Sequence, residues 1–280
     1  MADNTALHIL RQRPDSSARP IAEACRDASR DAGAGPARSL YIHIPFCFHK
    51  CHYCDFYSFV DTKDRQPAFV RRLCEELRAL APLAQGTPLE TIFVGGGTPT
   101  LLAAELWQPL LECLHEVFDL SAMSSGAGEF TVECNPETAD AALFDVLVAG
   151  GVNRLSIGAQ SFNETHLKTL ERWHDPASVA KAVELARQAG IERRSVDLIY
   201  AIPGQTADDV AEDLDRAFAL PIDHVSAYNL TYEPNTAMTV RRDRGDFVEA
   251  TEDTELEMFW LVRKKCIANG FEPYEVSNFA

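Results

Sequence analysis

The sequence has few basic residues and no long apolar run, and each shortage excludes a class of protein. Its 26 Lys and Arg residues stand against 42 Asp and Glu residues, which gives a formal net charge of −16. Because nucleic-acid binding depends on a basic surface, we expect no nucleic-acid partner. The sequence also lacks the run of roughly 18 apolar residues that spans a bilayer. We therefore expect a globular protein rather than a membrane-spanning one.

Residues 1–38 do not have the features of a targeting signal. They contain six arginines but also five acidic residues, whereas mitochondrial transit peptides contain few acids. They also lack an apolar core for secretion and any helical or strand periodicity, so we expect a flexible leader here. The expected location is then the cytoplasm, where thiols stay reduced. Eight cysteines in 280 residues do not make a disulfide scaffold, so a tight cysteine cluster indicates metal binding or catalysis.

From Leu40 onward, short apolar runs alternate with segments of helical spacing. The expected strands are residues 40–45, 91–97, 130–136, 154–162, 193–204 and 224–232. The expected helices are residues 66–83, 102–118, 139–151, 178–190, 208–220 and 249–270. Six such pairs, joined by short turns that contain Gly or Pro, predict an α/β domain with a parallel sheet over residues 39–280. The sheet is expected to curl into a partial (β/α)6 TIM-like barrel, with an open doubly wound sheet as the alternative; both place function beyond the carboxyl ends of the strands.

Two stretches near the C-terminus stand outside this alternation. Residues 240–254, VRRDRGDFVEATEDT, are expected to form an exposed connection. The sequence then stops at YEVSNFA without a terminating turn, so we expect the C-terminal part of the domain to be truncated.

Cys47, Cys51 and Cys54 lie within eight residues, directly after the first expected strand. A structural zinc ion normally takes four protein ligands. The histidines that could supply the fourth are His43, His49 and His52. A cubic iron–sulfur cluster also normally takes four thiolates, so three would leave one iron free to bind a small molecule. The C-x3-C-x2-C spacing at a strand end favours the iron–sulfur cube, and zinc remains the alternative.

Motifs after the later strands suit the binding of a ligand. Residues 95–97 are three glycines that let a ligand approach the backbone, or else simply form a tight turn. Glu133 and Gln160 end the third and fourth strands, and Arg172 has a guanidinium that can bind a carboxylate bidentately. Asp197 lies inside an otherwise apolar strand, where an unpaired charge is costly. We expect these side chains to gather at one end of the sheet.

The stretch CFHKCHYC resembles the C-x3-C-x-aromatic-C loop of the radical S-adenosylmethionine (radical SAM) enzymes. The resemblance implies a radical SAM core with a [4Fe-4S] cluster on Cys47, Cys51 and Cys54. It also implies that the open iron chelates the methionine part of S-adenosyl-L-methionine (SAM), whose sulfonium bond an electron from the cluster then splits. Carried over position by position, the implied SAM contacts are Tyr41, Tyr53, Gly96, Gly97, Thr98, Glu133, Gln160, Arg172 and Asp197.

The motifs LYIHIPFC, GGGTPT, NRLSIGAQSF, DLIYAIPGQT and YEVS are together similar to the coproporphyrinogen dehydrogenase-like branch of this family. The dehydrogenases of the branch carry a fourth cysteine two residues after the third, and that position is Phe56 here. The resemblance therefore implies a heme chaperone, which delivers heme to acceptor proteins; the alternative is an oxygen-independent coproporphyrinogen III dehydrogenase. The implied partners are a heme-accepting protein, which can be membrane-bound, and an electron donor of the flavodoxin or ferredoxin type.

Heme is a further ligand implied by the resemblance, but no residue is singled out to bind it. No C-x-x-C-H attachment motif is present. The candidate heme ligands are His49, His52, His174 or a tyrosine. The cysteines outside the loop are expected to be buried as small hydrophobic side chains. These are Cys25, Cys74, Cys113 and Cys266, while the role of Cys134 stays open.

Overall fold

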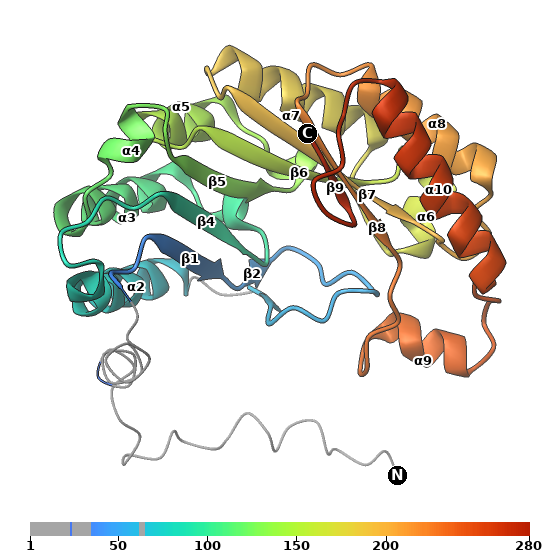
Figure 1. Cartoon of the computed structure of the whole chain (residues 1–280). Coiled ribbons are helices and arrows are strands. Elements are labelled where there is room, and N and C mark those ends of the chain that lie inside the picture. The colour runs from blue at the N-terminus through green and yellow to red at the C-terminus, as the bar shows by residue number, and fades with distance from the viewer. Residues whose placement is uncertain (1–22, 24–34, 62–64) are drawn as a thin grey trace, which may run out of the picture.

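The computed structural model describes Glu23 and residues 35–61 and 65–280 (Figure 1). The predicted leader over residues 1–38 lies largely outside the described residues, as does Cys25. Its last two residues, Ala37 and Arg38, contact the rest of the chain. The Ala37 N–H donates to the Leu83 carbonyl, and Arg38 forms an ion pair with Glu90.

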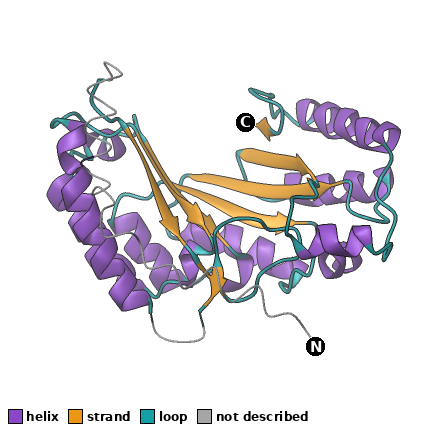
Figure 2. Cartoon of the chain, turned by 90° about the horizontal axis from the view of Figure 1, so that it is seen from below, coloured by secondary structure: helices purple, strands orange, loops and turns teal. Residues whose placement is uncertain are grey.

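A seven-stranded sheet forms the centre of the molecule, in the order β1-β4-β5-β6-β7-β8-β9 (Figure 1). Its strands are β1 (Ser39–Ile44), β4 (Thr91–Gly96), β5 (Glu129–Cys134), β6 (Arg154–Gln160), β7 (Arg193–Tyr200), β8 (His224–Asn229) and β9 (Asn278–Phe279). Neighbouring strands from β1 to β8 are parallel, and β9 runs antiparallel to β8. The strand order follows the chain without the reversal of a doubly wound sheet, and the sheet is curved (Figure 2). The predicted partial (β/α)6 TIM-like barrel is confirmed, and the doubly wound alternative is wrong.

Helices cover the outer side of the curved sheet (Figure 2). The helices from residue 66 onward are α2 (Gln66–Leu80), α3 (Ala104–Val117), α4 (Ser121–Ser124), α5 (Ala141–Ala149), α6 (Glu164–Thr169), α7 (Pro176–Gln188), α8 (Ala207–Phe218), α9 (Ala237–Asp243) and α10 (Glu252–Ala268). Helix α9 lies apart from the outer layer, beyond the end of β8 (Figure 1). The inner faces of the helices in that layer are apolar, as in α3, where Trp107, Leu110 and Leu114 are fully buried. Full burial of such a side chain contributes about 1.5–3 kcal/mol, so the helices hold the barrel in its curved form.

Each helix from α5 to α10 begins at a residue whose side chain accepts a backbone N–H of the first turn. These N-cap residues are Asp140, Asn163, Asp175, Thr206, Thr236 and Thr251. A side-chain cap of this kind contributes about 1 kcal/mol by satisfying an N–H that has no partner within the helix. The helix starts, and therefore the lengths of the loops above the strands, are encoded locally.

The prediction of an exposed connection over residues 240–254 is wrong at both of its ends. Helix α9 covers residues 240–243 because Thr236 caps its start and Met238, in its first turn, is fully buried. Helix α10 begins at Glu252, so only the middle of the stretch is a connection. The end of the sequence also forms structure, since β9 pairs with β8.

Within residues 35–61 and 65–280, no helix is both long and apolar enough to cross a membrane. Cys74, Cys113 and Cys266 are buried in α2, α3 and α10, which confirms the prediction made for them.

Candidate functional site

The three predicted cluster cysteines lie in the loop that follows β1. This loop starts in β2 (Phe46–Cys47) and ends in β3 (Phe59–Val60), which pair as a small parallel sheet. All three cysteines are free thiols; Cys47 is buried, and Cys51 and Cys54 are partly exposed. Burial raises the pKa of the Cys54 thiol, and the Phe56 backbone N–H opposes that rise.

Backbone hydrogen bonds fix the loop at its base and at its middle. At the base, the Phe59 N–H donates to the Pro45 carbonyl at 2.9 Å. At the middle, the His52 N–H donates to the Leu170 carbonyl at 3.2 Å, just before Arg172. The cysteine loop is therefore tied to the segment that follows β6.

The three thiols are not arranged around a single ion. Across the described part of the chain, no group of three or more His, Cys, Asp or Glu side chains is placed to hold one metal ion. A zinc site needs thiolate sulfurs at about 2.3 Å from one point. A cubic cluster instead spreads its thiolate ligands over several irons, so its sulfurs lie farther apart. The zinc alternative therefore has no preformed group of three ligands within the described residues.

A cavity of about 1550 Å³ runs through the barrel from the cysteine loop to the amino ends of β5, β6 and β7. Its lining includes the three loop cysteines and all but one of the predicted SAM contacts. These contacts are Tyr53, Gly96, Gly97, Thr98, Glu133, Gln160, Arg172 and Asp197. The structure thus brings together, around one cavity, residues that are scattered from position 47 to position 197 of the sequence.

Tyr41 is the predicted contact that does not line this cavity. Its side chain is 58% exposed, and its hydroxyl is hydrogen bonded to His43 Nδ1 at 2.9 Å. Its ring stacks on Phe93, which does line the cavity. Tyr41 therefore lies one side chain away from the cavity wall.

The glycines after β4 are required by close packing. Gly96 has φ +112°, and a Cβ there would lie 2.5 Å from the His43 ring. A Cβ on Gly97 would lie 2.6 Å from the Phe46 carbonyl oxygen. The N–H groups of Gly96, Gly97 and Thr98 already donate to Glu133, Ile44 and Phe46. Any contact that a ligand makes with this backbone is therefore with carbonyl oxygens, which accept hydrogen bonds from an ammonium group.

Glu133 projects from β5 into the cavity, and its carboxylate accepts the Gly96 N–H at 3.0 Å. Burial raises the pKa of Glu133 to about 7; the Gly96 N–H opposes this shift, and the charge of Asp197 adds to it. Gly95 makes room for the carboxylate, since a Cβ there would lie 2.8 Å from it. Near neutral pH, Glu133 is therefore partly protonated in the ligand-free protein.

Arg172 connects the end of β6 with the cysteine loop. Its Nη2 donates to the Gly158 carbonyl at 2.9 Å, and its Nη1 donates to Cys51 Sγ at 3.6 Å. Its Nε is buried and has no hydrogen-bond partner among the residues that the structure describes. An unpaired buried N–H is costly, and a bound anion would relieve that cost.

Asp197 is buried on β7, but its carboxylate is not left unpaired. Ser156 Oγ donates to it at 2.8 Å, and Ser195 Oγ donates at 3.3 Å. Burial raises the pKa of Asp197, and the serine hydroxyls oppose the rise. Ser195 Oγ also lies 2.8 Å from His224 Nδ1, and His224 Nε2 lies 2.8 Å from the Tyr274 hydroxyl. A chain of polar contacts therefore leads from Asp197 toward the other end of the barrel.

Of the histidines named as heme candidates, His49 and His174 line the cavity and His52 does not. His49 stacks on Trp173 with ring centroids 3.9 Å apart, and His52 contacts Arg241. Burial lowers the pKa of His174 to about 4, so this imidazole is neutral near pH 7.

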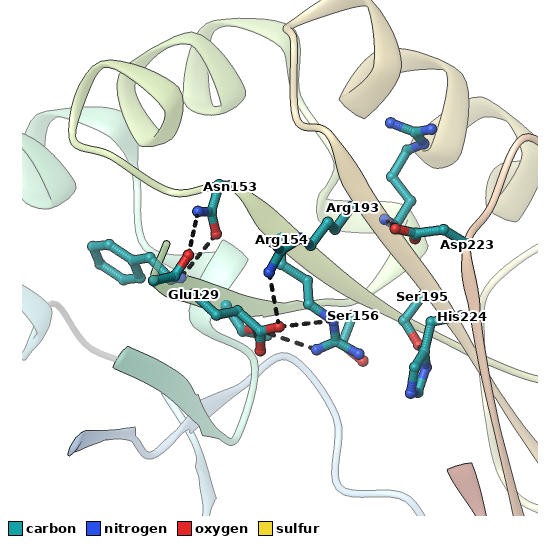
Figure 3. Close-up of polar contacts among 12 residues, drawn as sticks. Glu129, Asn153, Arg154, Ser156, Arg193, Ser195, Asp223 and His224 are labelled. Atoms are coloured by element: carbon teal, nitrogen blue, oxygen red, sulfur yellow. Dashed lines mark hydrogen bonds and ion pairs between the residues drawn. The ribbon is translucent and has the colours of Figure 1, made fainter. Parts of the chain in front are cut away.

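Sequence reasoning missed the charged residues at the amino end of the cavity. Glu129, Arg154 and Arg193 line it there, and Figure 3 shows the Glu129 carboxylate in contact with both arginines. One signal could have found them. They stand four residues before Glu133, Gly158 and Asp197 on the same three strands, and residues separated by an even number share one face of a strand.

The family model of the radical SAM superfamily matches residues 41–217. The chain belongs to the radical SAM superfamily. It is 38% identical over 241 residues to the heme chaperone HemW of Lactococcus lactis. This alignment covers 86% of this chain and 62% of that protein. It is 37% identical over 243 residues to HemW of Bacillus subtilis, in an alignment that covers 87% of this chain and 63% of that protein.

The solved structure of the radical SAM enzyme coproporphyrinogen III oxidase (HemN) from Escherichia coli superposes with a TM-score of 0.79 at 28% identity. The match covers 91% of this chain and 58% of that one. The chain therefore spans less than two thirds of the length of these radical SAM relatives. The predicted resemblance to the coproporphyrinogen dehydrogenase-like branch is confirmed.

Proposed function

We propose that this radical SAM chain is of the HemW type: it holds a [4Fe-4S] cluster and SAM, and it delivers heme to acceptor proteins. The observation that carries the proposal is that three free thiols and eight of the nine predicted SAM contacts line a single cavity. Heme delivery rests on the similarity to two HemW chaperones at 37–38% identity.

The donor groups in the cavity fit the two cofactors. Cys47, Cys51 and Cys54 would hold the cluster and leave one of its irons for SAM. The buried Arg172 Nε, which has no partner within the described residues, suits a ligand carboxylate. When bound, these cofactors supply one-electron chemistry, while the protein supplies binding and orientation.

The side chains around the cavity have distinct roles in binding SAM. Glu133 would accept a hydrogen bond from the ligand ammonium, which requires that its carboxyl group first lose its proton. Since burial raises the pKa of Glu133 to about 7, binding of a cation here releases a proton near neutral pH. Asp197, whose hydroxyl partners hold it in place, would accept a hydrogen bond from a ribose hydroxyl. Arg172 would bind the carboxylate and, through Nη1, stabilise the Cys51 thiolate.

The second candidate is a coproporphyrinogen III dehydrogenase, which the structural similarity to HemN favours. Phe56 argues against it. The resemblance gives the dehydrogenases a cysteine at this position, whereas the Phe56 side chain is 59% exposed and lines the cavity without a thiol. We therefore place heme delivery first.

Heme titration beside a turnover assay separates the two candidates. Anaerobically reconstituted protein is titrated with hemin by absorbance and, in parallel, is given coproporphyrinogen III, SAM and a reduced flavodoxin. We expect stoichiometric heme binding, transfer of heme to an apo-acceptor protein, and no decarboxylation. Decarboxylation without tight heme binding would overturn the chaperone proposal in favour of the dehydrogenase.

A further inference from the structure

The inside of the barrel leaves room for a ligand below the proposed SAM site. In a closed (β/α)8 barrel, bulky branched side chains fill the interior in layers. Here Thr131, Ser156, Ser195 and Ser226 occupy inward positions in the middle of β5, β6, β7 and β8, and all are small hydroxyl residues. Ser156 and Ser226 line the cavity. The middle of this barrel is therefore open at the positions that bulky side chains fill in a closed (β/α)8 barrel.

Two arginines contact one carboxylate at the amino end of this space. We call these three residues, Glu129, Arg154 and Arg193, the floor. Arg193 Nη1 lies 3.5 Å and Arg154 Nε lies 3.9 Å from Glu129 Oε2 (Figure 3). Arg154 Nη1 also donates to Thr131 Oγ1 at 3.3 Å. A guanidinium has five N–H donors, so among the residues that the structure describes these contacts leave most of the donors of both arginines unused. The floor therefore carries one more positive charge than negative charge.

Two further titratable groups, His224 and the acid Asp223, line the cavity at this end. Burial and the nearby Arg154 charge lower the pKa of His224 to about 4, so this imidazole is neutral near pH 7. Asp223 accepts the backbone N–H of Arg194 at 2.7 Å and forms no ion pair with either floor arginine within the described part of the chain. In a chain of net charge −16, two inward-facing guanidiniums are a local exception.

We propose that Arg154 and Arg193 form a carboxylate-binding site, and that it holds a propionate of the tetrapyrrole that the chain carries. The choice of a tetrapyrrole rests on the proposed function. The planar guanidinium fork matches a carboxylate bidentately, and it keeps its charge at every physiological pH. Arg154 precedes Gly158 by four residues on β6, which is about 13 Å along a strand. A molecule anchored at the floor therefore lies between the arginines and the cofactor end.

Hemin and hemin dimethyl ester, which lacks free carboxylates, are the probes that test this site. Both are titrated into the reconstituted 280-residue chain and into its Arg154→Gln and Arg193→Gln variants. We expect each variant to bind hemin about tenfold more weakly, as the loss of a charge-assisted contact implies, and to bind the ester as wild type does. Arg187→Gln is the matched control, because Arg187 is exposed on α7 and pairs with Glu184. It should bind both probes as wild type does.

A variant with the opposite expected effect guards against simple misfolding. Glu129→Gln removes the carboxylate that competes for both arginines, so we expect it to bind hemin several-fold more tightly. Equal hemin affinity in wild type, Arg154→Gln and Glu129→Gln would overturn the floor site.

Coproporphyrin III, which has four propionates, is titrated in parallel by fluorescence. If it binds in an arginine-dependent way while hemin does not bind, the floor site stands and the heme chaperone proposal falls. If neither porphyrin binds, or if both bind without dependence on the arginines, the floor site itself is wrong.

Discussion

At the carboxyl end of the sheet, the three thiols that would hold the cluster come from one short stretch, the loop from Cys47 to Cys54. At the amino end, the floor residues Glu129, Arg154 and Arg193 come from the first positions of three different strands. The cysteine loop is encoded by spacing within one segment, and the floor is encoded by register between strands. Both ends line one cavity. The sequence alone therefore predicts the cysteines of this cavity but not the charged residues at its floor.

The largest expected effect is the loss of iron when a cysteine at the cofactor end is replaced. In Cys51→Ser we expect anaerobic reconstitution to fail, because the cluster would lose one of its three thiolates; wild type should bind about four irons per chain. Iron and sulfide analysis measures this. Cys113→Ala, which removes a thiol buried in α3, should reconstitute as wild type does. If Cys51→Ser kept its full iron content, the loop would not be the cluster site.

The next largest effect comes from Glu133. Its folded-state pKa of about 7 lies above the ordinary 4.5, so the folded protein binds this proton more tightly than the unfolded chain does. The resulting stability is fully present below about pH 4.5 and is lost as the pH rises through 7, in total about 3 kcal/mol. Glu133→Gln removes this term. At pH 8 the ligand-free variant should therefore unfold at a higher urea concentration than wild type.

The same urea series at pH 5 provides the contrast. There Glu133 is mostly protonated in the folded state, so the difference between wild type and Glu133→Gln should shrink. The exposed Glu112→Gln is the control and should follow wild type at both pH values. A constant difference between pH 5 and pH 8 would show that burial does not hold the proton on Glu133.

Arg172 tests whether the cofactor end binds SAM separately from the cluster. Arg172→Gln should weaken SAM binding about 30-fold, or about 2 kcal/mol, while the iron content stays near that of wild type. Isothermal titration of the reconstituted protein measures the affinity, with Arg187→Gln as the control. Iron lost in parallel with SAM affinity would instead mean that the Arg172 contact with Cys51 Sγ mainly supports the cluster.

The smallest expected effect is a loss of stability when Ser195, which lies between the two ends of the cavity, is replaced. Ser195 Oγ contacts both Asp197 and His224, so Ser195→Ala leaves a buried imidazole nitrogen without this partner. We expect a loss of about 1 kcal/mol in the free energy of unfolding, with unchanged iron content. Urea denaturation measures the loss, and Ser178→Ala serves as the control, because its partly exposed hydroxyl donates to Glu137, which lies outside the strands. A stability equal to wild type would show that the contacts from Asp197 to His224 carry no energy.

Much of the fold could be predicted because its strands are apolar runs bounded by turn residues. The predicted strand over residues 154–162 and β6, for example, begin at the same arginine. Helix α9 was missed because it is short and polar; its existence depends on the Thr236 cap and on the burial of Met238 by residues distant in sequence. Strand β9 depends on pairing with β8, which no local pattern reveals.

The candidate site likewise has features that the sequence predicts and features that it does not. The cysteine loop could be predicted because its spacing carries its chemistry. The contact of Asp197 with Ser156 could not, since it depends on the register of β6 with β7. The other partner, Ser195, stands two residues before Asp197 on β7 itself. The raised pKa of Glu133 likewise depends on burial, which a single strand-end acid does not disclose.

Electron paramagnetic resonance of the reduced, reconstituted protein tests the central claim most directly. If three thiolates leave one iron of the cluster free at the cavity, SAM binds that iron and changes its surroundings. We expect the spectrum to shift when SAM is added to wild type. A full cluster whose spectrum does not respond to saturating SAM would contradict the claim.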